Sequence, residues 1–202
     1  MKPRIEEKLE VSVCDYPKVM AWLRNNEFTV LHPTRVVNSI YFDNQCLQML
    51  CDAQEGITPR RKIRIRYYGN ERLSSARNYA LEIKQSTAHG RLKSIQRDVN
   101  FAKAFRKGIY DIHYGLCFPV VKISYEREYF ILNDWRLTLD RAITYQGSSN
   151  HLKTSASKAC DSSFVLEIKT SADQDKNILR NFFNFPRSKF SKYERSFEHL
   201  GL

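Results

Sequence analysis

Alternation of polar and apolar residues is the main pattern along this chain. In residues 60–66 the order is Arg-Arg-Lys-Ile-Arg-Ile-Arg. Successive side chains of a β-strand point to opposite faces, so one face of this segment carries Arg60, Lys62, Arg64 and Arg66. Like charges on one face repel unless solvent screens them or a polyanion lies against them. This row of cations is therefore the strongest indication of function in the sequence.

Four further segments alternate in the same way. Their polar faces consist of Glu6 with Lys8, Glu82 with Lys84, Arg136 with Thr138 and Asp140, and Glu167 with Lys169. In an open antiparallel sheet such faces would be the solvent side. If the sheet closes into a barrel with these faces inward, its interior holds many cations and a few carboxylates. That interior would suit a phosphate chain with a bound divalent metal.

The same patterning predicts mostly strands, with a few helices between them. Strands are expected at residues 4–13, 35–42, 60–68, 78–86, 91–99, 120–132, 135–144 and 163–170. Residues 87–90 are expected to form the turn of a hairpin between the fourth and fifth of these strands. The sequence thus predicts one α+β domain that spans residues 1–202.

Helices are expected where capping residues precede an apolar stripe. Asp15 with Pro17 begins the first, and Asp43-Asn44 begins a second that runs to about Ala53. Three more are expected at 101–107, 171–186 and 190–197, while the serine-rich stretch 147–161 is expected to be an exposed loop.

The charge balance points to an anionic partner. Lys and Arg number 33 against 22 Asp and Glu, which gives a formal charge of +11. Nucleic acid, an acidic membrane surface and a phosphorylated small molecule all fit this charge. Single-stranded nucleic acid is bound by stacking on aromatic side chains, but the cationic face of 60–66 carries none, and Tyr67 falls on the opposite face. We therefore expect no nucleic-acid partner.

The remaining composition favours a reduced, intracellular protein. Five cysteines occur without a Cys-x-x-Cys pair, so free thiols are expected. The five histidines lack metal-ligand spacing, so no zinc site is expected. A charged N-terminus and the lack of a long apolar run predict neither a signal peptide nor a membrane span, and hence a cytoplasmic location.

Seven strings occur in an order that is typical of one family. They are Ser39 to Asp43, Lys62 to Arg66, Leu81 to Lys84, Ile123 to Arg127, Arg136 to Asp140, Val165 to Lys169, and Ser191 to Tyr193. Together they resemble the VTC domain, the polyphosphate polymerase branch of the triphosphate tunnel (CYTH-like) superfamily. The resemblance implies a closed antiparallel β-barrel, the tunnel, flanked by helices.

The resemblance also implies a reaction and a set of site residues. The family transfers the γ-phosphoryl group of ATP to polyphosphate with Mn²⁺ or Mg²⁺, and some members work beside membrane proteins, so a membrane-protein partner is possible. By position, the phosphate-binding residues would be Lys8, Lys62, Arg64, Arg66, Lys84, Arg127, Arg136, Lys169 and Lys192. The metal ligands would be Glu167, Glu82 and Glu6, with Ser39, Tyr41, Thr138 and Asp140 as supporting polar residues. We expect seven of these side chains to point into one shared cavity: Lys62, Arg64, Arg66, Glu82, Lys84, Arg136 and Glu167. The sequence leaves the oligomeric state open.

Two alternatives stay open beside the polymerase. A hydrolase of tripolyphosphate or nucleoside triphosphates would have the same fold, and a non-catalytic sensor would bind the same ligands. The chain lacks the Glu-x-Glu-x-Lys string of the tunnel phosphatases, because only Glu6 and Lys8 of that pattern are present, and this favours the VTC branch. After Lys84 the chain has Gln85 and Ser86 where eukaryotic polymerases carry a histidine, so one basic contact of that branch is missing.

Overall fold

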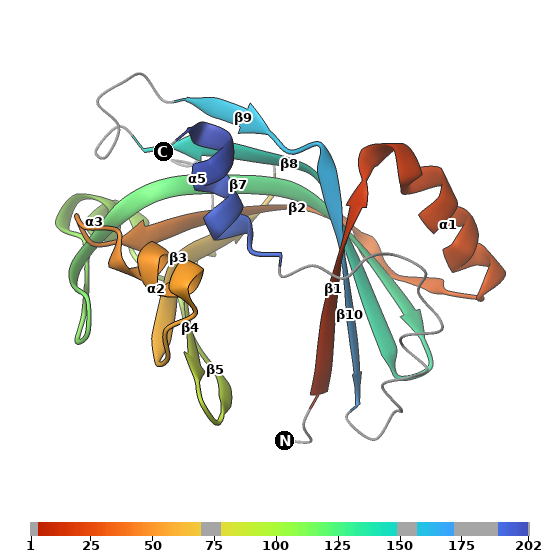
Figure 1. Cartoon of the computed structure of the whole chain (residues 1–202), viewed down its shortest axis with the longest axis horizontal. Coiled ribbons are helices and arrows are strands. Elements are labelled where there is room, and N and C mark those ends of the chain that lie inside the picture. The colour runs from red at the N-terminus through yellow and green to blue at the C-terminus, as the bar shows by residue number, and fades with distance from the viewer. Residues whose placement is uncertain (1–3, 70–77, 149–156, 172–189, 202) are drawn as a thin grey trace. The chain divides into compact units, whose positions relative to one another are not determined.

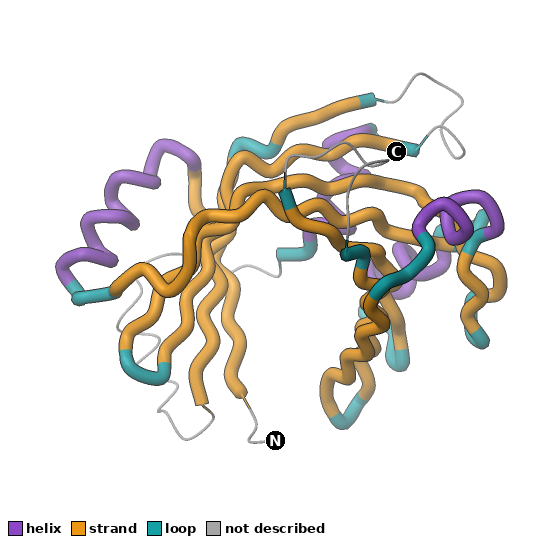
Figure 2. The backbone as a smooth tube through the Cα atoms, turned by 180° about the vertical axis from the view of Figure 1, so that it is seen from behind, coloured by secondary structure: helices purple, strands orange, loops and turns teal. Residues whose placement is uncertain are grey.

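A computed structural model of the chain describes residues 4–69, 78–148, 157–171 and 190–201. Strands make up most of the described chain, and helices are few (Figure 2). The strands are β1 (Arg4–Ser12), β2 (Thr29–Asp43), β3 (Arg60–Tyr68), β4 (Ala80–Thr87), β5 (Gly90–Arg97), β6 (Ile109–Asp111), β7 (Gly115–Leu132), β8 (Trp135–Gly147), β9 (Lys158–Cys160) and β10 (Ser163–Ser171). The helices are the 3-10 helix η1 (Val13–Asp15) and the α-helices α1 (Tyr16–Asn25), α2 (Gln48–Glu55), α3 (Phe101–Lys107) and α5 (Lys192–Leu200) (Figure 1).

The eight predicted strands and four of the five predicted helices are confirmed. The helix predicted at 171–186 lies outside the described residues, apart from Ser171, which ends β10. The short strands β6 and β9 were not predicted, and β9 lies in the stretch 147–161 that was expected to be a loop. The five cysteines are free, as expected. Among the described helices, none is both long and apolar enough to cross a membrane.

The strands follow the hydrogen-bonded order β1-β10-β8-β7-β2-β3-β4-β5. Each pairing whose register is described is antiparallel. The expectation of a closed barrel is not met, because no ladder between β1 and β5 joins the ends of this order within the described part of the chain. Strand β5 is exposed along its length and carries Arg91, Lys93 and Arg97. Charged side chains on an edge strand oppose further pairing, which gives a physical reason for the open end.

The chain divides into two compact units, and the strands β2, β7 and β8 contribute to both. Unit 1 comprises residues 1–35, 125–143 and 161–190, and unit 2 comprises residues 36–124, 144–160 and 191–202. Each unit has its own hydrophobic core.

The core of unit 1 lies between helix α1 and the apolar face of β1, β8 and β10. Val19 and Leu23 of α1 pack with Leu137 of β8 and Leu166 of β10, and all four are almost fully buried. Helix α1 begins after Asp15, as predicted, with proline in its first turn. This packing leaves the opposite, polar face of the three strands available for chemistry.

The core of unit 2 lies on the apolar face of β2 and β3. Ile63 and Ile65 are fully buried there and pack with Met49 of α2 and Ala104 of α3. The carboxylate of Asp43 accepts hydrogen bonds from the backbone N–H groups of Met49 and Leu50, at 3.1 and 3.0 Å, and so caps α2 from the end of β2. The predicted capping role of this aspartate is thus confirmed, and helix α2 in turn contacts β3 and α5.

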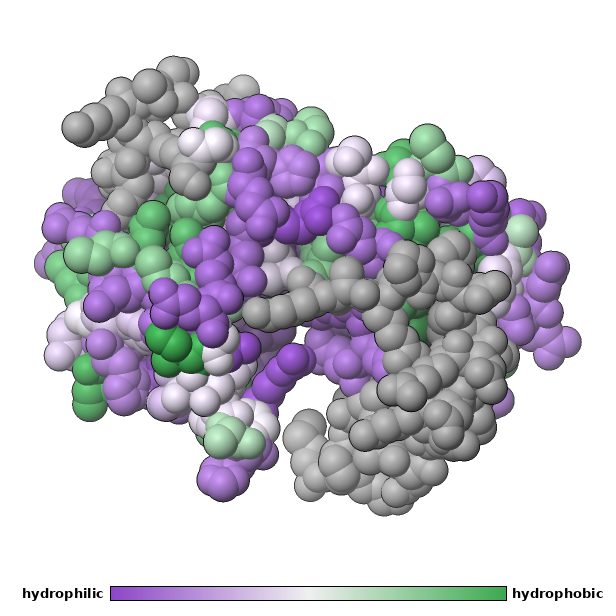
Figure 3. Space-filling model, viewed as in Figure 1, coloured by the Kyte–Doolittle hydropathy of each residue, from purple (hydrophilic) through white to green (hydrophobic). Residues whose placement is uncertain are grey.

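Hydrophilic side chains predominate on the face of the protein seen in Figure 3, with hydrophobic ones scattered among them. This distribution agrees with a chain of which 27% of residues are charged.

Candidate functional site

The predicted row of cations lies on β3, inside unit 2. Lys62, Arg64 and Arg66 alternate with the buried isoleucines of the core, so they occupy the other face of the strand. Across the ladders, Arg66 pairs with Ser39 and Arg64 with both Tyr41 and Glu82. We call this set the β3 cationic face, and it consists of Ser39, Tyr41, Lys62, Arg64, Arg66, Glu82 and Lys84.

Glu82 is the buried counter-ion of this face. Its carboxylate lies 2.6 Å from Nη2 of Arg64, 3.7 Å from Nη1 of Arg66 and 2.8 Å from Nζ of Lys93. Burial alone would raise the pKa of a carboxyl group that is only 5% exposed. The charges of Arg64 and Arg66 outweigh burial and lower the pKa of Glu82 to about 2. One ionised carboxylate therefore holds three cations together.

Tyr41 also lies in the field of these cations. Its hydroxyl oxygen accepts a hydrogen bond from Nη1 of Arg64 at 2.9 Å, and its ring stacks on Tyr193 of α5 at 5.0 Å between centroids. Burial raises the pKa of this phenol, but the charges of Arg64, Arg66 and Lys84 lower it to about 7. A phenol that ionises near neutral pH shows that the potential on this face is strongly positive.

Lys62 is bound by the first turn of α5. Its amine donates to the hydroxyl of Ser191 at 2.9 Å and to the carboxylate of Glu194 at 2.8 Å. Ser191 is also the N-cap of α5 and accepts from the backbone N–H of Glu194. Serine followed three residues later by glutamate is the spacing of a capping box. The last described helix is thus attached to the β3 cationic face.

Two charged residues of this region, Lys93 and Glu194, were not among those predicted from the sequence. Glu194 could have been found from the capping-box spacing with Ser191. Lys93 could have been found from the hairpin turn, because a turn at residues 87–90 sets the register in which Lys84 opposes Lys93. Lys93 then lies diagonally from Glu82, within reach of a long side chain.

A second polar cluster lies on β1, β8 and β10, inside unit 1. In the ladders Lys8 opposes Glu167, and Glu167 in turn opposes Thr138. We call this set the β10 carboxylate cluster, and it consists of Glu6, Lys8, Arg136, Thr138, Glu167 and Lys169.

Glu167 is the most strongly perturbed group of the β10 carboxylate cluster. Its carboxylate lies 2.7 Å from Nζ of Lys169. Burial alone would raise the pKa of Glu167, but the positive charges of Lys169, Lys8 and Arg127 lower it well below its ordinary range. Glu6 is paired more loosely with Lys8, at 3.7 Å.

Arg127 and Asp140 form a buried ion pair beside this cluster. The guanidinium donates to both carboxylate oxygens, with Nε 2.5 Å from Oδ1 and Nη2 2.7 Å from Oδ2. Asp140 is fully buried, and the pair raises the pKa of Arg127 further above its already high range even though burial opposes this. The guanidinium of Arg127 is therefore engaged by protein, and a phosphate would have to share it.

The resemblance implies a divalent metal, and the carboxylates differ in how well their surroundings fit such an ion. Among the described residues, no group of three or more His, Cys, Asp or Glu side chains could hold a metal. Mg²⁺ commonly binds through one or two carboxylates together with substrate phosphates and water. Glu167 fits this mode, because its ladder neighbour Thr138 has a buried hydroxyl with no hydrogen-bond partner. Glu82 does not fit, because three cations already engage its carboxylate.

The predicted site residues thus fall into the two units. Lys192 lies half-buried in α5. The other predicted residues lie in the β3 cationic face or in the β10 carboxylate cluster with its Arg127–Asp140 pair, and of these Lys84 and Arg136 are exposed. That the seven side chains named for it share one cavity stays a prediction.

Comparisons with known proteins extend this picture. A family model described as the VTC domain matches residues 1–111 and 90–200. A candidate adenylate cyclase from Bacillus halodurans has a similar solved structure, with 14% identity, coverage of 97% of this chain and 98% of its own, and a TM-score of 0.62. A candidate adenylate cyclase from Vibrio parahaemolyticus is 13% identical over 94% of this chain and 95% of its own, with a TM-score of 0.55. A protein from Pyrococcus horikoshii is 16% identical over 96% of both chains, with a TM-score of 0.54.

At these identities the structural likeness shows the fold alone, and it extends over nearly the whole chain. No curated protein sequence gave a match. The two matched ranges of the family model together span residues 1–200. The chain therefore belongs to the VTC domain family.

Proposed function

We propose that this VTC domain is a metal-dependent phosphotransferase that moves the γ-phosphoryl group of ATP onto a polyphosphate chain and releases ADP. Family membership supports a triphosphate-binding protein, and the side chains described above support the reaction.

The observation that carries the proposal is the convergence of cations around Glu82. Arg64, Arg66 and Lys93 all lie within 3.7 Å of this one carboxylate. Lys62 and Lys84 stand on the same face. The positive charges of Arg64, Arg66 and Lys84 lower the pKa of Tyr41 on this face, which supports a positive local potential. A chain of phosphates, with about one negative charge on each unit, is the ligand class that neutralises such a face.

Phosphoryl transfer requires mainly that the reacting groups are held in line and that charge on the equatorial oxygens is neutralised. Arg64 and Arg66 provide guanidinium donors for those oxygens, and the amine of Lys62 provides another. Glu167 and Glu6 would hold the divalent metal that the family resemblance implies, and such an ion supplies positive charge that neutralises phosphate oxygens. None of these roles needs a covalent nucleophile.

Neither Glu82 nor Glu167 has the acid–base properties that hydrolysis would need. The terminal oxygen of a polyphosphate chain is already ionised near neutral pH, so its attack needs no general base, whereas attack by water does. A general base works best when its pKa lies near the working pH. The pKa of Glu82 is about 2, and that of Glu167 is also far below its ordinary range. These two carboxylates are therefore poor bases for activating water.

The test is incubation of the purified protein with ATP and Mn²⁺, followed by separation of the products by length. We expect ADP together with phosphate chains that lengthen with time. Release of orthophosphate without chains would indicate a hydrolase, and binding of ATP without turnover would indicate a sensor. Either result would contradict the proposal.

A matched pair of variants on β3 makes the test specific. Arg66→Gln removes a cation of the β3 cationic face, and we expect chain synthesis to fall at least tenfold. Arg60→Gln removes a cation of the same strand whose guanidinium donates to the backbone carbonyls of Gly56 and Ile57. We expect this control to keep its activity within about twofold, because a surface substitution of this kind has a small effect.

A further inference from the structure

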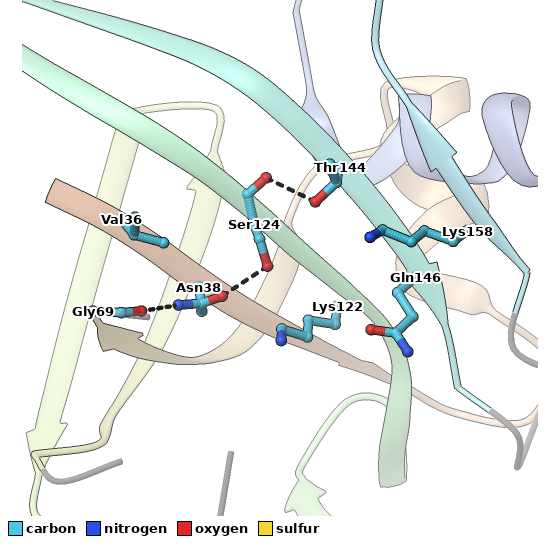
Figure 4. A pocket seen from close by; sticks show the side chains of 8 residues that line it. All are labelled: Val36, Asn38, Gly69, Lys122, Ser124, Thr144, Gln146 and Lys158. Carbon is cyan, nitrogen blue, oxygen red and sulfur yellow. Dashed lines mark hydrogen bonds between the residues drawn. The ribbon is translucent and has the colours of Figure 1, made fainter. Parts of the chain in front are cut away.

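A separate pocket opens in unit 2, on the other face of β2 from Tyr41. It has a volume of about 270 Å³. Strands β2, β7, β8 and β9 contribute to its walls, together with the residue that follows β3 (Figure 4). The lining residues are Val36, Asn38, Gly69, Lys122, Ser124, Thr144, Gln146 and Lys158. Asn38 directly precedes Ser39, so alternation along β2 directs its side chain away from the β3 cationic face.

One wall of the pocket is fixed by a chain of hydrogen bonds. The amide nitrogen of Asn38 donates to the carbonyl of Gly69 at 2.9 Å, and the hydroxyl of Ser124 donates to Oδ1 of Asn38 at 2.7 Å. The hydroxyl of Thr144 donates to the backbone carbonyl of Ser124 at 3.4 Å (Figure 4). These contacts hold the polar groups of β2, β7 and β8 in place, so this wall is built before any ligand enters.

The two lysines of the pocket lack a compensating charge. Within the described part of the chain, the side-chain amines of Lys122 and Lys158 have no hydrogen bond or ion pair, and no carboxylate is among the lining residues. The amine of Lys122 lies 5.9 Å from the ring centroid of Tyr67, which is a weak substitute for a counter-ion. Partial burial of Lys122 also lowers its pKa. Two like charges in one pocket favour an anionic ligand.

We propose that this pocket binds a small oxyanion of the phosphate class, with the amines of Lys122 and Lys158 as charged donors and the amide of Gln146 as a neutral one. Its volume lies at the low end of ligand pockets, which fits a single phosphate group. Val36 is the only apolar side chain among the lining residues, so a largely apolar ligand would lack contacts. The site is distinct from the β3 cationic face and does not depend on the proposed transfer reaction.

The test is an NMR titration of the isotope-labelled protein with orthophosphate, carried out with tripolyphosphate already saturating its own site. We expect saturable shifts of the backbone amides of Asn38, Gly69, Ser124, Thr144 and Gln146. A parallel titration with methyl phosphate distinguishes two natural ligands. Similar affinities for both probes indicate a site for a phosphate monoester, whereas weaker binding of methyl phosphate indicates a site for free phosphate.

Variants decide whether the lysines carry the binding. In Lys122→Gln/Lys158→Gln the affinity for orthophosphate should fall at least tenfold, while Lys122→Arg should keep it within about threefold. A dispersed amide spectrum establishes that each variant is folded. The proposal is overturned if the pocket amides do not shift at tens of millimolar phosphate. It is also overturned if the shifts are confined to β3 and β4, or if the double variant binds as well as the parent.

Discussion

Replacement of Glu82 by glutamine distinguishes two possible roles of this residue, that of a counter-ion and that of a metal ligand. The sequence allowed Glu82 as a metal ligand, but the structure places it between Arg64, Arg66 and Lys93. Glutamine keeps the shape of the side chain and removes its charge. If Glu82 is a counter-ion, Glu82→Gln should lower the stability of the free protein and strengthen its binding of polyanions. If Glu82 is a metal ligand, the variant should instead need more Mn²⁺.

The magnitude follows from the pKa of the carboxyl group. The pKa of Glu82 falls from its ordinary 4.5 to about 2. Since one pKa unit corresponds to 1.36 kcal/mol, the surroundings favour the ionised carboxylate by about 3 kcal/mol. Breaking a buried ion pair by removing one partner costs a similar ~3–5 kcal/mol. We therefore expect Glu82→Gln to lower the free energy of unfolding at pH 7 by about 3 kcal/mol.

The pH dependence provides an internal check. Because the folded pKa of Glu82 lies below the unfolded one, its contribution is complete above about pH 4.5 and is lost as the pH falls toward 2. Urea unfolding of the parent and of Glu82→Gln should therefore differ most near neutral pH and converge in acid. Glu126→Gln is the control, because its partner Arg141 and Glu126 itself are both about 40% exposed and such a pair is worth less than about 1 kcal/mol.

Binding is the second half of this prediction. Calorimetric titration with tripolyphosphate should show at least tenfold tighter binding by Glu82→Gln, because the cations no longer have an internal partner. Tripolyphosphate should also restore most of the lost stability. A variant of unchanged stability, or one that binds tripolyphosphate more weakly than the parent, would refute the assignment of Glu82 as the counter-ion.

Three further predictions test other parts of the two sites. Tyr41 should titrate near pH 7 in the phenolate absorbance of the free protein, with no such transition in Tyr41→Phe; its folded pKa lies below the ordinary 10, so its contribution to stability should grow as the pH rises from about 7 to 10. Bound tripolyphosphate adds negative charge and should move this transition toward higher pH, and an unmoved transition would count against phosphate binding at this face. Arg127→Gln leaves Asp140 buried without its partner and should lower the free energy of unfolding by ~3–5 kcal/mol in urea, whereas a loss below about 1 kcal/mol would mean that the pair is not buried as described. Glu167→Gln should abolish Mn²⁺-dependent turnover while it keeps tripolyphosphate affinity, and Arg66→Gln should lose affinity at least tenfold; equal calorimetric losses in both would show that the division between metal and phosphate residues is wrong.

The face of β3 was predictable because strand alternation is a local property. Ile63 and Ile65 alternate with Arg64 and Arg66, and the apolar residues had to be the buried ones. The capping of α2 by Asp43 was predictable for the same reason, since caps act within a few residues. Such features need no knowledge of distant partners.

Other features depend on contacts that local patterns do not contain. Strand β2 starts at Thr29, whereas the sequence predicted a start at residue 35. The first part of the strand, which includes Pro33, could not be predicted because its side chains are mostly exposed and show no alternation. The pairs of Arg127 with Asp140 and of Lys62 with Glu194 join residues 13 and 132 positions apart. Strands β6 and β9 have three residues each, too few for a periodic pattern. Closure of the sheet was expected from family resemblance, and nothing in a single strand decides whether the last edge finds a partner.

The register of β2 has a consequence for how this domain tolerates changes in length. Ser39 contributes to the β3 cationic face, and its neighbour Asn38 lines the pocket that contains Lys122 and Lys158 and is hydrogen-bonded to Ser124 there. Deletion or insertion of one residue within this strand would exchange the two faces and damage both surfaces together. The turn at residues 87–90 contributes to neither of these two surfaces. Exposed hairpin tips also tolerate inserted residues well. Protein engineers who wish to lengthen, label or split this domain should therefore work at the β4–β5 turn and leave the middle of β2 unaltered.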